Sequence, residues 1–297
     1  MMTNSVPSFL KTFVLGDDGI FGSANVSVLQ GTEHQFRETL AQAWLKAAVP
    51  SYLDEVSKHH SIPVMDREVE RFVSGIPNEG IILDVGGCWG WHWRRLTDMR
   101  PDIRVVIVDF VRSNLLHAMK ILDNNVRNNI HFVHADAVSL EFPSNTFDGY
   151  WSVQALQHIP DLHKALKEAK RVLKPTGVFV DYSLNDCLLA RLVYRIMRKQ
   201  YVVEGMVRDS FFLRRMTDKT LRIYSEVFST PPKTRYSEII FKPEFRFAGP
   251  GREDSFLGKI DCWLSGSNKM LLLVARQRST HISMWNFPAR IGLDLSV

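Results

Sequence analysis

The stretch ILDVGGCWGWHWRRL, from Ile82 to Leu96, decides the fold of this chain. It opens with a short apolar run of the kind that forms a buried strand, and it continues into a turn that contains Gly86, Gly87 and Gly90. In open α/β sheets such a turn lies at the carboxyl end of the first strand, where these sheets bind ligands. Because glycines let the backbone approach a ligand closely, the stretch predicts a ligand site.

The segments after this stretch continue the alternation of strand and helix. Short apolar runs rich in β-branched residues predict strands, and helical patterns separate most of them. Near-continuous apolar strands indicate a parallel sheet that is covered on both faces. We therefore expect an α/β fold with a doubly wound, mostly parallel seven-stranded sheet. The predicted strands are Ile81–Val85, Arg104–Phe110, Ile130–Asp136, Phe147–Val153, Gly177–Ser183, Thr234–Phe241 and Lys269–Gln277.

Further segments lie on both sides of this sheet. The region before it predicts two short helices, interrupted at Pro50, and a third helix that stops at Gly75. We expect these helices and an insertion after the fifth strand to form a lid over the site. The expected divisions are an irregular arm at residues 1–31, helices at 32–79, the α/β domain at 80–278 with a helical insertion at about 186–230, and a tail at 279–297.

The positive charge of the chain is concentrated in one segment. The whole chain has a formal net charge of +5 and a pI of about 9.1. Between Arg191 and Arg222, nine lysines and arginines stand against three acids, so this segment is more positive than the chain as a whole. The stretch CLLARLVYRIMRKQ, from Cys187 to Gln200, overlaps the start of this segment and has apolar and basic residues on opposite faces of a predicted helix. The basic face suits an acidic small molecule, an anionic membrane surface or RNA, and a merely solvated face is the alternative.

The three cysteines, Cys88, Cys187 and Cys262, limit the redox and metal chemistry. They are odd in number, widely separated and without CxxC spacing, which argues against a disulfide framework and against a metal site. The N-terminus lacks the pattern of a signal peptide, and no stretch approaches the roughly 18 apolar residues of a membrane span. We expect a cytoplasmic protein without a metal.

Two kinds of cofactor compete for the glycine turn. A dinucleotide such as NAD requires a G-x-G-x-x-G pattern, but Cys88 stands where the second of these glycines belongs. S-adenosylmethionine has no phosphate, and it requires one acid near its methionine part and another at its ribose. Asp84 precedes the turn, and Asp109 ends the second strand, where a carboxylate can accept hydrogen bonds from both ribose hydroxyls. The spacing of these two acids also suits NAD, so the pair alone leaves both cofactors open.

A later stretch, from His134 to Tyr182, carries several motifs in order. They are an acidic strand end, an apolar run before Phe-Asp, a histidine turn and a basic loop, at Asp136, Leu140–Pro143, Phe147–Asp148, Gln157–Ile159 and Arg171–Gly177. This series resembles the core of class I S-adenosylmethionine-dependent methyltransferases of the small-molecule type, such as the ubiquinone/menaquinone C-methyltransferase group. The resemblance covers roughly residues 81–182. It departs from the family pattern at Cys88 and Thr176, which replace glycines.

The resemblance implies a contact with S-adenosyl-L-methionine for residues in the glycine turn and at the strand ends. Cys88 is small enough to be tolerated in this turn if its φ stays negative. The implied contacts are Asp84, Gly86 and Gly90 around the methionine part, Asp109 on the ribose hydroxyls, Phe110 on the adenine face, Asp136 and the Ala137 amide at the adenine edge, and Gln154 beside the sulfonium.

The catalytic side chains are predicted less directly. Methyl transfer from a sulfonium is an in-line displacement with a good leaving group, so positioning matters more than a fixed catalytic set. His158 follows the fourth strand and is the candidate general base, with structural packing as the alternative. Trp91 and Trp93 are expected to face different ways on a helix and to serve mainly packing, and His92 is expected at the surface or a helix end.

The leading hypothesis is an S-adenosylmethionine-dependent methyltransferase that acts on a small molecule, and an acidic molecule is one of the partners that the basic segment would suit. The second is an RNA or protein methyltransferase that uses residues 191–222, although the chain shows no dedicated nucleic-acid-binding module. The third is a methyltransferase-like scaffold or partner subunit that binds the cofactor poorly, which Cys88 motivates. An NAD-dependent oxidoreductase is the fourth. The basic helix leaves peripheral membrane contact open, and the sequence predicts no oligomeric state.

Overall fold

The computed structural model describes most of the chain. The described residues are 7–23, 32–46, 52–57, 60, 62–186, 188–207, 210–239, 255–260 and 278–285.

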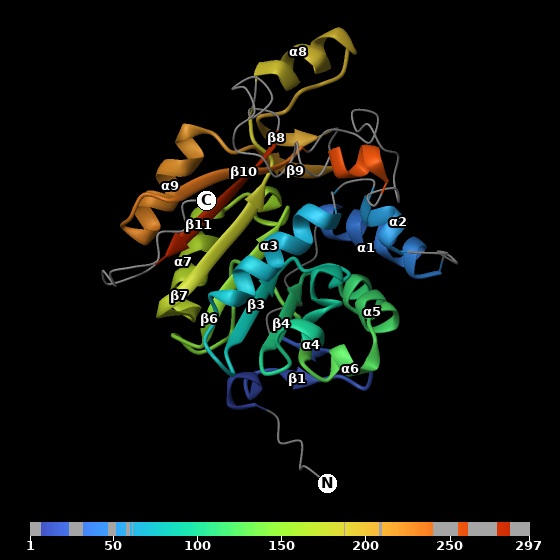
Figure 1. Cartoon of the computed structure of the whole chain (residues 1–297), viewed down its shortest axis with the longest axis vertical. Helices are drawn as coiled ribbons and strands as arrows, with labels where there is room; N and C mark the ends of the chain where they lie inside the picture. The colour runs from blue at the N-terminus through green and yellow to red at the C-terminus, as the bar shows by residue number, and fades with distance from the viewer. Residues whose placement is uncertain are drawn as a thin grey trace.

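The centre of the molecule is the predicted seven-stranded sheet, with the order β5-β4-β3-β6-β7-β11-β10 (Figure 1). The five strands β3 to β7 are parallel, and β11 runs antiparallel to both β7 and β10. The fold class predicted from the sequence is confirmed. The strands are β3 Ile81–Val85, β4 Arg104–Asp109, β5 Ile130–His134, β6 Phe147–Val153, β7 Leu173–Ser183, β10 Lys233–Ile239 and β11 Arg278–Trp285.

The N-terminal arm extends this sheet by two short strands. β2 (Phe21–Gly22) pairs in parallel with β5, and β1 (Val14–Leu15) pairs antiparallel with β2. The sheet therefore has nine strands among the described residues. The arm, expected to be irregular, is thus partly regular, because the open edge of β5 supplies hydrogen-bond partners that no local pattern reveals.

The strand next to β7 lies later in the chain than the sequence predicts. The structure has β11 at Arg278–Trp285, within the expected tail, and it pairs with β7 from Thr280↔Ser183 to Trp285↔Val178. The predicted run Lys269–Gln277 lies outside the described residues. β11 has a partner on each side, and such pairing can outweigh the weak strand pattern of RSTHISMW.

Helices cover both faces of the sheet and enclose two apolar clusters. One cluster joins the sheet to α2, α3, α4, α5 and α6, and the other joins it to α7 and α9. α1 (Thr32–Lys46) lies along α5, where Glu38 accepts a hydrogen bond from the Ser113 hydroxyl. The covering helices are α2 Tyr52–Ser57, α3 Ile62–Ser74, α4 Leu96–Met99, α5 Arg112–Ile121, α6 Asn124–Arg127, α7 Leu162–Val172 and α9 Asp218–Phe228.

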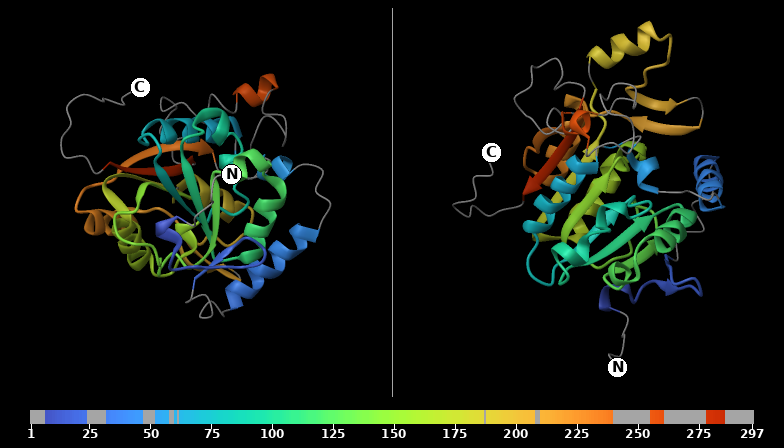
Figure 2. Two further views of the ribbon diagram at one scale, coloured as in Figure 1. Left: turned by 90° about the horizontal axis from the view of Figure 1, so that it is seen from below. Right: turned by 45° about the vertical axis from the view of Figure 1, so that its right-hand side comes forward.

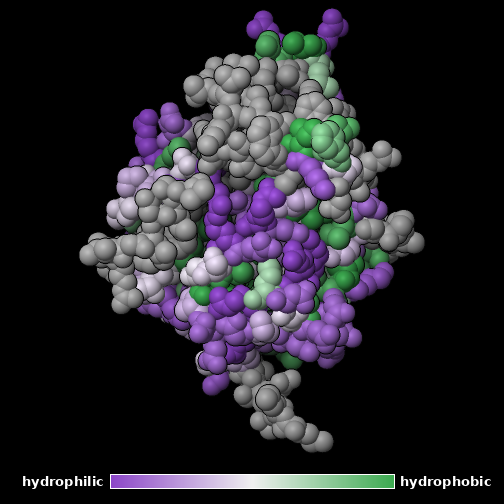
Figure 3. Space-filling model, viewed as in Figure 1, coloured by the Kyte–Doolittle hydropathy of each residue, from purple (hydrophilic) through white to green (hydrophobic). Residues whose placement is uncertain are grey.

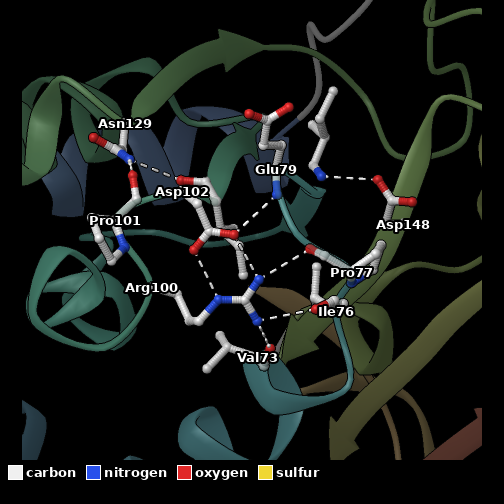
Figure 4. A network of polar contacts seen from close by, with 11 residues as sticks. Val73, Ile76, Pro77, Glu79, Arg100, Pro101, Asp102, Asn129 and Asp148 are labelled. Atoms are coloured by element: carbon white, nitrogen blue, oxygen red, sulfur yellow. Dashed lines mark hydrogen bonds and ion pairs between the residues drawn. The ribbon is translucent and has the colours of Figure 1, made fainter.

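A polar network holds the amino-terminal edge of the sheet (Figure 4). The Arg100 guanidinium donates to both carboxylate oxygens of Asp102 at 2.8 and 2.7 Å. It also donates to the carbonyl oxygens of Val73, Ile76 and Pro77 at 2.9, 3.0 and 3.1 Å. The first two carbonyls lie at the end of α3, where a helix leaves acceptors without intrahelical donors. This network fixes α3 at the edge opposite to the glycine turn.

The insertion between β7 and β10 begins at the carboxyl edge of the parallel strands with α8 (Leu188–Ile196) and a hairpin of β8 (Glu204–Val207) and β9 (Phe211–Arg214). It ends with α9, which packs beside α7 on a face of the sheet. The hairpin forms a separate two-stranded sheet. Figure 2 shows α8 and this hairpin beyond the end of the central sheet.

Candidate functional site

The glycine turn after β3 has a backbone that only glycine accommodates easily. Gly86 and Gly90 have φ of +72° and +66°. A Cβ atom on Gly86 would lie 2.1 Å from the Cβ of Ala155, and one on Gly87 would lie 2.4 Å from Oδ2 of Asp84. The Gly86 N–H donates to the carbonyl of Val108 at 2.7 Å, which ties the turn to β4. The turn therefore packs tightly against the strand ends.

Cys88 adopts a conformation that is unfavourable for a residue with a side chain. Its φ is +49°, so the condition for an unstrained cysteine in this turn, a negative φ, is not met. The reason is a tertiary hydrogen bond, because the Cys88 N–H donates to Oδ2 of Asp109 at 3.1 Å. The left-handed region costs a non-glycine residue about 1 kcal/mol or more. Burial raises the pKa of the Cys88 thiol, which stays protonated.

The acid of β3 lies buried beneath the turn. Oδ2 of Asp84 accepts the indole N–H of Trp93 at 2.7 Å, whereas Oδ1 is buried and has no partner. Burial raises the pKa of Asp84 to about 7, against the opposing effect of the Trp93 hydrogen bond, and the nearby Asp109 raises it further. An acid that is half protonated near neutrality, and that has one oxygen without a hydrogen-bond partner, can pair with a cationic group.

The acid at the end of β4 faces the same turn. Asp109 accepts the backbone N–H groups of Val111 at 2.8 Å and Cys88 at 3.1 Å, and the Asn114 amide lies at 3.4 and 3.5 Å from its oxygens. Burial raises the pKa of Asp109 to about 6, while these hydrogen bonds lower it. Asp84 and Asp109 thus lie at the ends of neighbouring strands, as the sequence predicts.

The aromatic segment after the turn is part of the core. Trp91–Trp93 form a 3-10 helix, and Trp91 and Trp93 are buried in the same apolar cluster. Their contacts differ, because Trp91 lies against His60 and Trp93 against Trp151, and the expectation that both serve packing is confirmed. His92 is 6 % exposed, which contradicts the expected surface position. Its ring lies 4.1 Å from that of Trp91, its two nitrogens have no partner, and burial lowers its pKa well below the ordinary value.

The remaining predicted cofactor residues lie at the ends of β4, β5 and β6. The carbonyl of Phe110 is within 3.0 Å of ring nitrogens of both His34 and His134. Gln154 has φ of +54°, and its N–H donates to the carbonyl of Tyr182 at 2.6 Å. The side-chain nitrogen of Gln154 is buried without a partner. Ala137 is buried, and Asp136 accepts the N–H of Val138 at 3.0 Å.

A chain of hydrogen bonds joins the end of β7 to the insertion. Oε1 of Gln157 accepts the Leu184 N–H at 2.8 Å, so its amide nitrogen faces Nε2 of His158 at 3.2 Å. Nδ1 of His158 lies 2.7 Å from the carbonyl of Phe212, which can only accept. His158 therefore carries its proton on Nδ1, and its Nε2 accepts from Gln157.

The same chain continues into α1. The Phe212 N–H donates to Oε2 of Glu33 at 3.2 Å, and Oε1 of Glu33 accepts from Nε of Arg37 at 2.9 Å. The guanidinium carbon of Arg37 lies 5.4 Å from the centre of the Phe211 ring and 5.9 Å from that of Phe110. One of its terminal nitrogens is buried without a partner. The backbone of Phe212 is thus held from both sides, by η4 (Leu156–His158) and by α1.

His158 is a weak base in this setting. Burial lowers its pKa to about 4, and the charge of Arg37 lowers it further, while the hydrogen bond to Phe212 opposes both effects. The imidazole is neutral near physiological pH, and its Nε2 already accepts from Gln157. Its hydrogen bonds to Gln157 and to the Phe212 carbonyl are those of a residue that holds the β8–β9 hairpin in position.

Several residues of this arrangement carry no signal in the sequence. Arg37 and Glu33 look like an ordinary helical ion pair, and Phe212 acts through its backbone. The hydrogen bond between Phe212 and Glu33 spans 179 positions, a distance over which no sequence period operates. Gln157 stands in the quoted histidine turn, so only its role was missed.

Two arginines of the basic segment are buried rather than presented to solvent. Arg214 donates to the carbonyls of Ile159 and Pro160 at 2.8 and 2.7 Å. Arg215 donates to the carbonyl of Val202 and stacks on the Tyr201 ring at 4.4 Å. Both are less than 9 % exposed, so they are unavailable to nucleic acid.

The comparisons with known proteins agree with this geometry. Residues 83–181 match the family described as "Methyltransferase domain". The chain contains a class I S-adenosylmethionine-dependent methyltransferase domain. This domain includes the end of β3, the glycine turn and the strands up to β7. The cofactor of this class is S-adenosyl-L-methionine.

Curated relatives cover only part of the chain. The ubiquinone/menaquinone biosynthesis C-methyltransferase UbiE of Rickettsia prowazekii (strain Madrid E) is 38% identical over 117 residues, which is 37% of this chain and 47% of that protein. The enzyme of the same name from Rickettsia bellii (strain OSU 85-389) has the same identity and coverage. The chain spans about half the length of these relatives.

A solved structure shows the same fold over more of the chain. The 1,6-didemethyltoxoflavin-N1-methyltransferase of Burkholderia thailandensis superposes with a TM-score of 0.51 and 14% identity, and covers 86% of this chain and 90% of that one. Among the described residues of our protein, no helix has the length and apolar character that crossing a bilayer requires. None of its described His, Cys, Asp and Glu residues form a cluster that could hold a metal ion.

Proposed function

We propose that this protein transfers a methyl group from S-adenosyl-L-methionine to an acidic small-molecule acceptor. The observation that carries the proposal is the glycine turn with Asp84 and Asp109 buried against it. A small-molecule acceptor agrees with the names of the curated relatives, which act in ubiquinone and menaquinone biosynthesis.

The residues of the site fit this cofactor. Oδ1 of Asp84 and the side-chain nitrogen of Gln154 are buried polar atoms without partners, which is costly unless a ligand satisfies them. The unpaired oxygen of Asp84 suits an ammonium group. The Asp109 oxygens retain acceptor capacity for ribose hydroxyls, and Phe110 offers a ring to an adenine. When bound, the cofactor supplies a methyl group on a sulfonium, which an acceptor takes by in-line displacement.

The chain itself contributes closure and positioning. The contacts of Phe212 with Glu33 and His158 hold α1 and the hairpin together next to the turn, so these elements can act as a lid that excludes water. His158 thereby positions the lid instead of acting as a general base. Arg37 brings a partly buried positive charge close enough to lower the pKa values of Asp109 and His158. A cation there favours an acceptor that already carries a negative oxygen, for which no general base is needed.

The test is calorimetric titration with S-adenosyl-L-methionine and S-adenosylhomocysteine, with NAD as the control. We expect micromolar binding of both sulfur ligands and none of NAD. Asp109→Ala should bind them at least tenfold more weakly, because the ribose hydroxyls lose a charged acceptor. Absence of binding by the folded protein would refute the proposal in favour of a methyltransferase-like scaffold. Unchanged binding by Asp109→Ala would refute the ribose assignment.

A further inference from the structure

The helix α8 stands away from the body of the molecule. It is the outermost element in Figure 1 and in the right-hand view of Figure 2. Two of its apolar side chains point to solvent, because Leu192 and Ile196 are 51 % and 70 % exposed, and Met197, which follows the helix, is 42 % exposed. Soluble proteins seldom gather large apolar side chains on a projecting helix unless the surface binds something.

Positive charges border this apolar surface. Arg195 follows Leu192 by three positions, so these two side chains are neighbours on the helix surface rather than on the opposite faces that the sequence predicts. Figure 3 shows apolar atoms at this end of the molecule with hydrophilic side chains on both sides. Asp186, which precedes α8, forms an ion pair with Arg191 at 2.5 Å. Arg195 and Arg198 are exposed. The sequence from Leu188 to Val203 holds three arginines and one lysine, and no aspartate or glutamate.

We propose that α8 docks on the surface of an anionic lipid bilayer. Leu192, Ile196 and Met197 enter the apolar side of the interface, and the arginines contact lipid phosphates with their stems along the surface. An RNA would pair with the cations but would leave the apolar residues in water. A bilayer with anionic headgroups satisfies both parts of the surface at once.

Docking would orient the methyltransferase site. Asp186 lies three residues after the end of β7, so α8 rises from the carboxyl edge of the sheet, where the glycine turn also lies. A bilayer bound to α8 therefore lies on the side of the molecule that holds the site. The inference goes beyond methyl transfer and does not depend on it.

The test is sedimentation of the full chain with vesicles of phosphatidylcholine, pure or mixed with phosphatidylglycerol. We expect binding to the mixed vesicles at low salt and weaker binding at high salt or to pure phosphatidylcholine. Arg195→Glu/Arg198→Glu should weaken binding about 25-fold or more, at about fivefold for each cation lost near an anionic surface. Leu192→Glu/Ile196→Glu should weaken it at least tenfold, because the apolar contact is lost.

A matched control is Arg104→Glu/Lys167→Glu, which makes the same change of charge at exposed positions on β4 and α7. It should bind vesicles within about threefold of the unmodified protein, since only charges within about a Debye length of the bilayer contribute strongly. A cooperative thermal unfolding transition, followed by circular dichroism, checks that every variant is folded, and titration with S-adenosylhomocysteine is measured separately. Vesicle binding without cofactor binding would support docking and refute the proposed function.

Three results would overturn the docking proposal. One is the absence of binding to the mixed vesicles at low salt. Another is an equal loss in the control and in Arg195→Glu/Arg198→Glu, which would show that only net charge matters. The third is unchanged binding by Leu192→Glu/Ile196→Glu, because no apolar contact would then exist. Binding of single-stranded RNA with no binding of vesicles would likewise assign the surface to nucleic acid.

Discussion

Binding of S-adenosyl-L-methionine should release a proton from Asp84. In the free protein, burial raises the pKa of Asp84 to about 7 and that of Asp109 to about 6. At about pH 7, roughly half of the Asp84 carboxyls and about a tenth of the Asp109 carboxyls are therefore protonated. A cationic ligand beside Asp84 favours the carboxylate, so binding should release about half a proton from this residue at that pH.

The same linkage predicts how affinity and stability depend on pH. If the ligand binds the ionised form of Asp84, affinity should rise about tenfold between about pH 6 and about pH 8. The stability of the free protein should change in the opposite direction. An acid whose pKa is raised on folding contributes its full stability below its unfolded pKa, about 4, and this contribution is lost as the pH rises through about 7.

Calorimetry in buffers of different ionisation enthalpy measures the released protons directly. Asp84→Asn is the matched variant, because an amide oxygen can still accept the indole N–H of Trp93. In this variant the release at about pH 7 should fall to about a tenth of a proton, which comes from Asp109. A ligand amino group with a pKa of about 8 contributes equally to both proteins. Equal release by the two proteins would refute the reasoning, as would constant affinity over this pH range.

Further predictions concern stability and catalysis. Arg100→Ala should lower the free energy of unfolding by about 2 kcal/mol in urea denaturation, because three carbonyls lose a donor, and should leave affinity for S-adenosylhomocysteine unchanged; weaker cofactor binding would contradict its purely structural role. Tyr224→Phe removes the hydroxyl that donates to Oδ2 of Asp181 at 2.6 Å and should cost about 1–3 kcal/mol. The loss should be larger above about pH 6 than below it, because burial already raises the pKa of Asp181 to about 6 and the lost donor favours the ionised form; a loss independent of pH would argue against this. Cys88→Gly should stabilise the fold by about 0.5–1 kcal/mol in thermal unfolding, since glycine adopts positive φ without strain, and a lower melting temperature would exclude strain at this residue. His158→Asn should leave the pH profile of methyl transfer unchanged near neutrality, because an imidazole with a pKa of about 4 is not the titrating base; loss of an ionisation from that profile would restore the general-base role.

Much of the sheet is predictable from local patterns. Ile81–Val85 and Phe147–Val153 are strands with the predicted bounds, because near-continuous apolar runs identify strands buried on both faces. β11 is missed because its residues alternate weakly and its two neighbours decide its position. The predicted helices around Pro50 are present as α1 and α2, with residues 47–51 outside the described part.

Some features of the candidate site are likewise predictable from the sequence, and others are not. Asp84 and Asp109 are predictable, since each ends or nearly ends a parallel strand and such ends meet at one edge. The positive φ of Cys88 is not, because it depends on a hydrogen bond to Asp109 across 21 positions. The buried position of His92 follows from the 3-10 turn that replaces the expected helix.

The sequence by itself determined the α/β class, the glycine turn and the acids at the strand ends. These features follow from composition and period, which report how a short segment is buried and how its backbone bends. Only the tertiary structure decided that Arg37 lies between Phe110 and Phe211 and that Phe212 joins Glu33 to His158. Those partners come together because the fold closes loops of 54 and 179 positions, and the free energy of that closure comes from packing the whole core rather than from any local pattern.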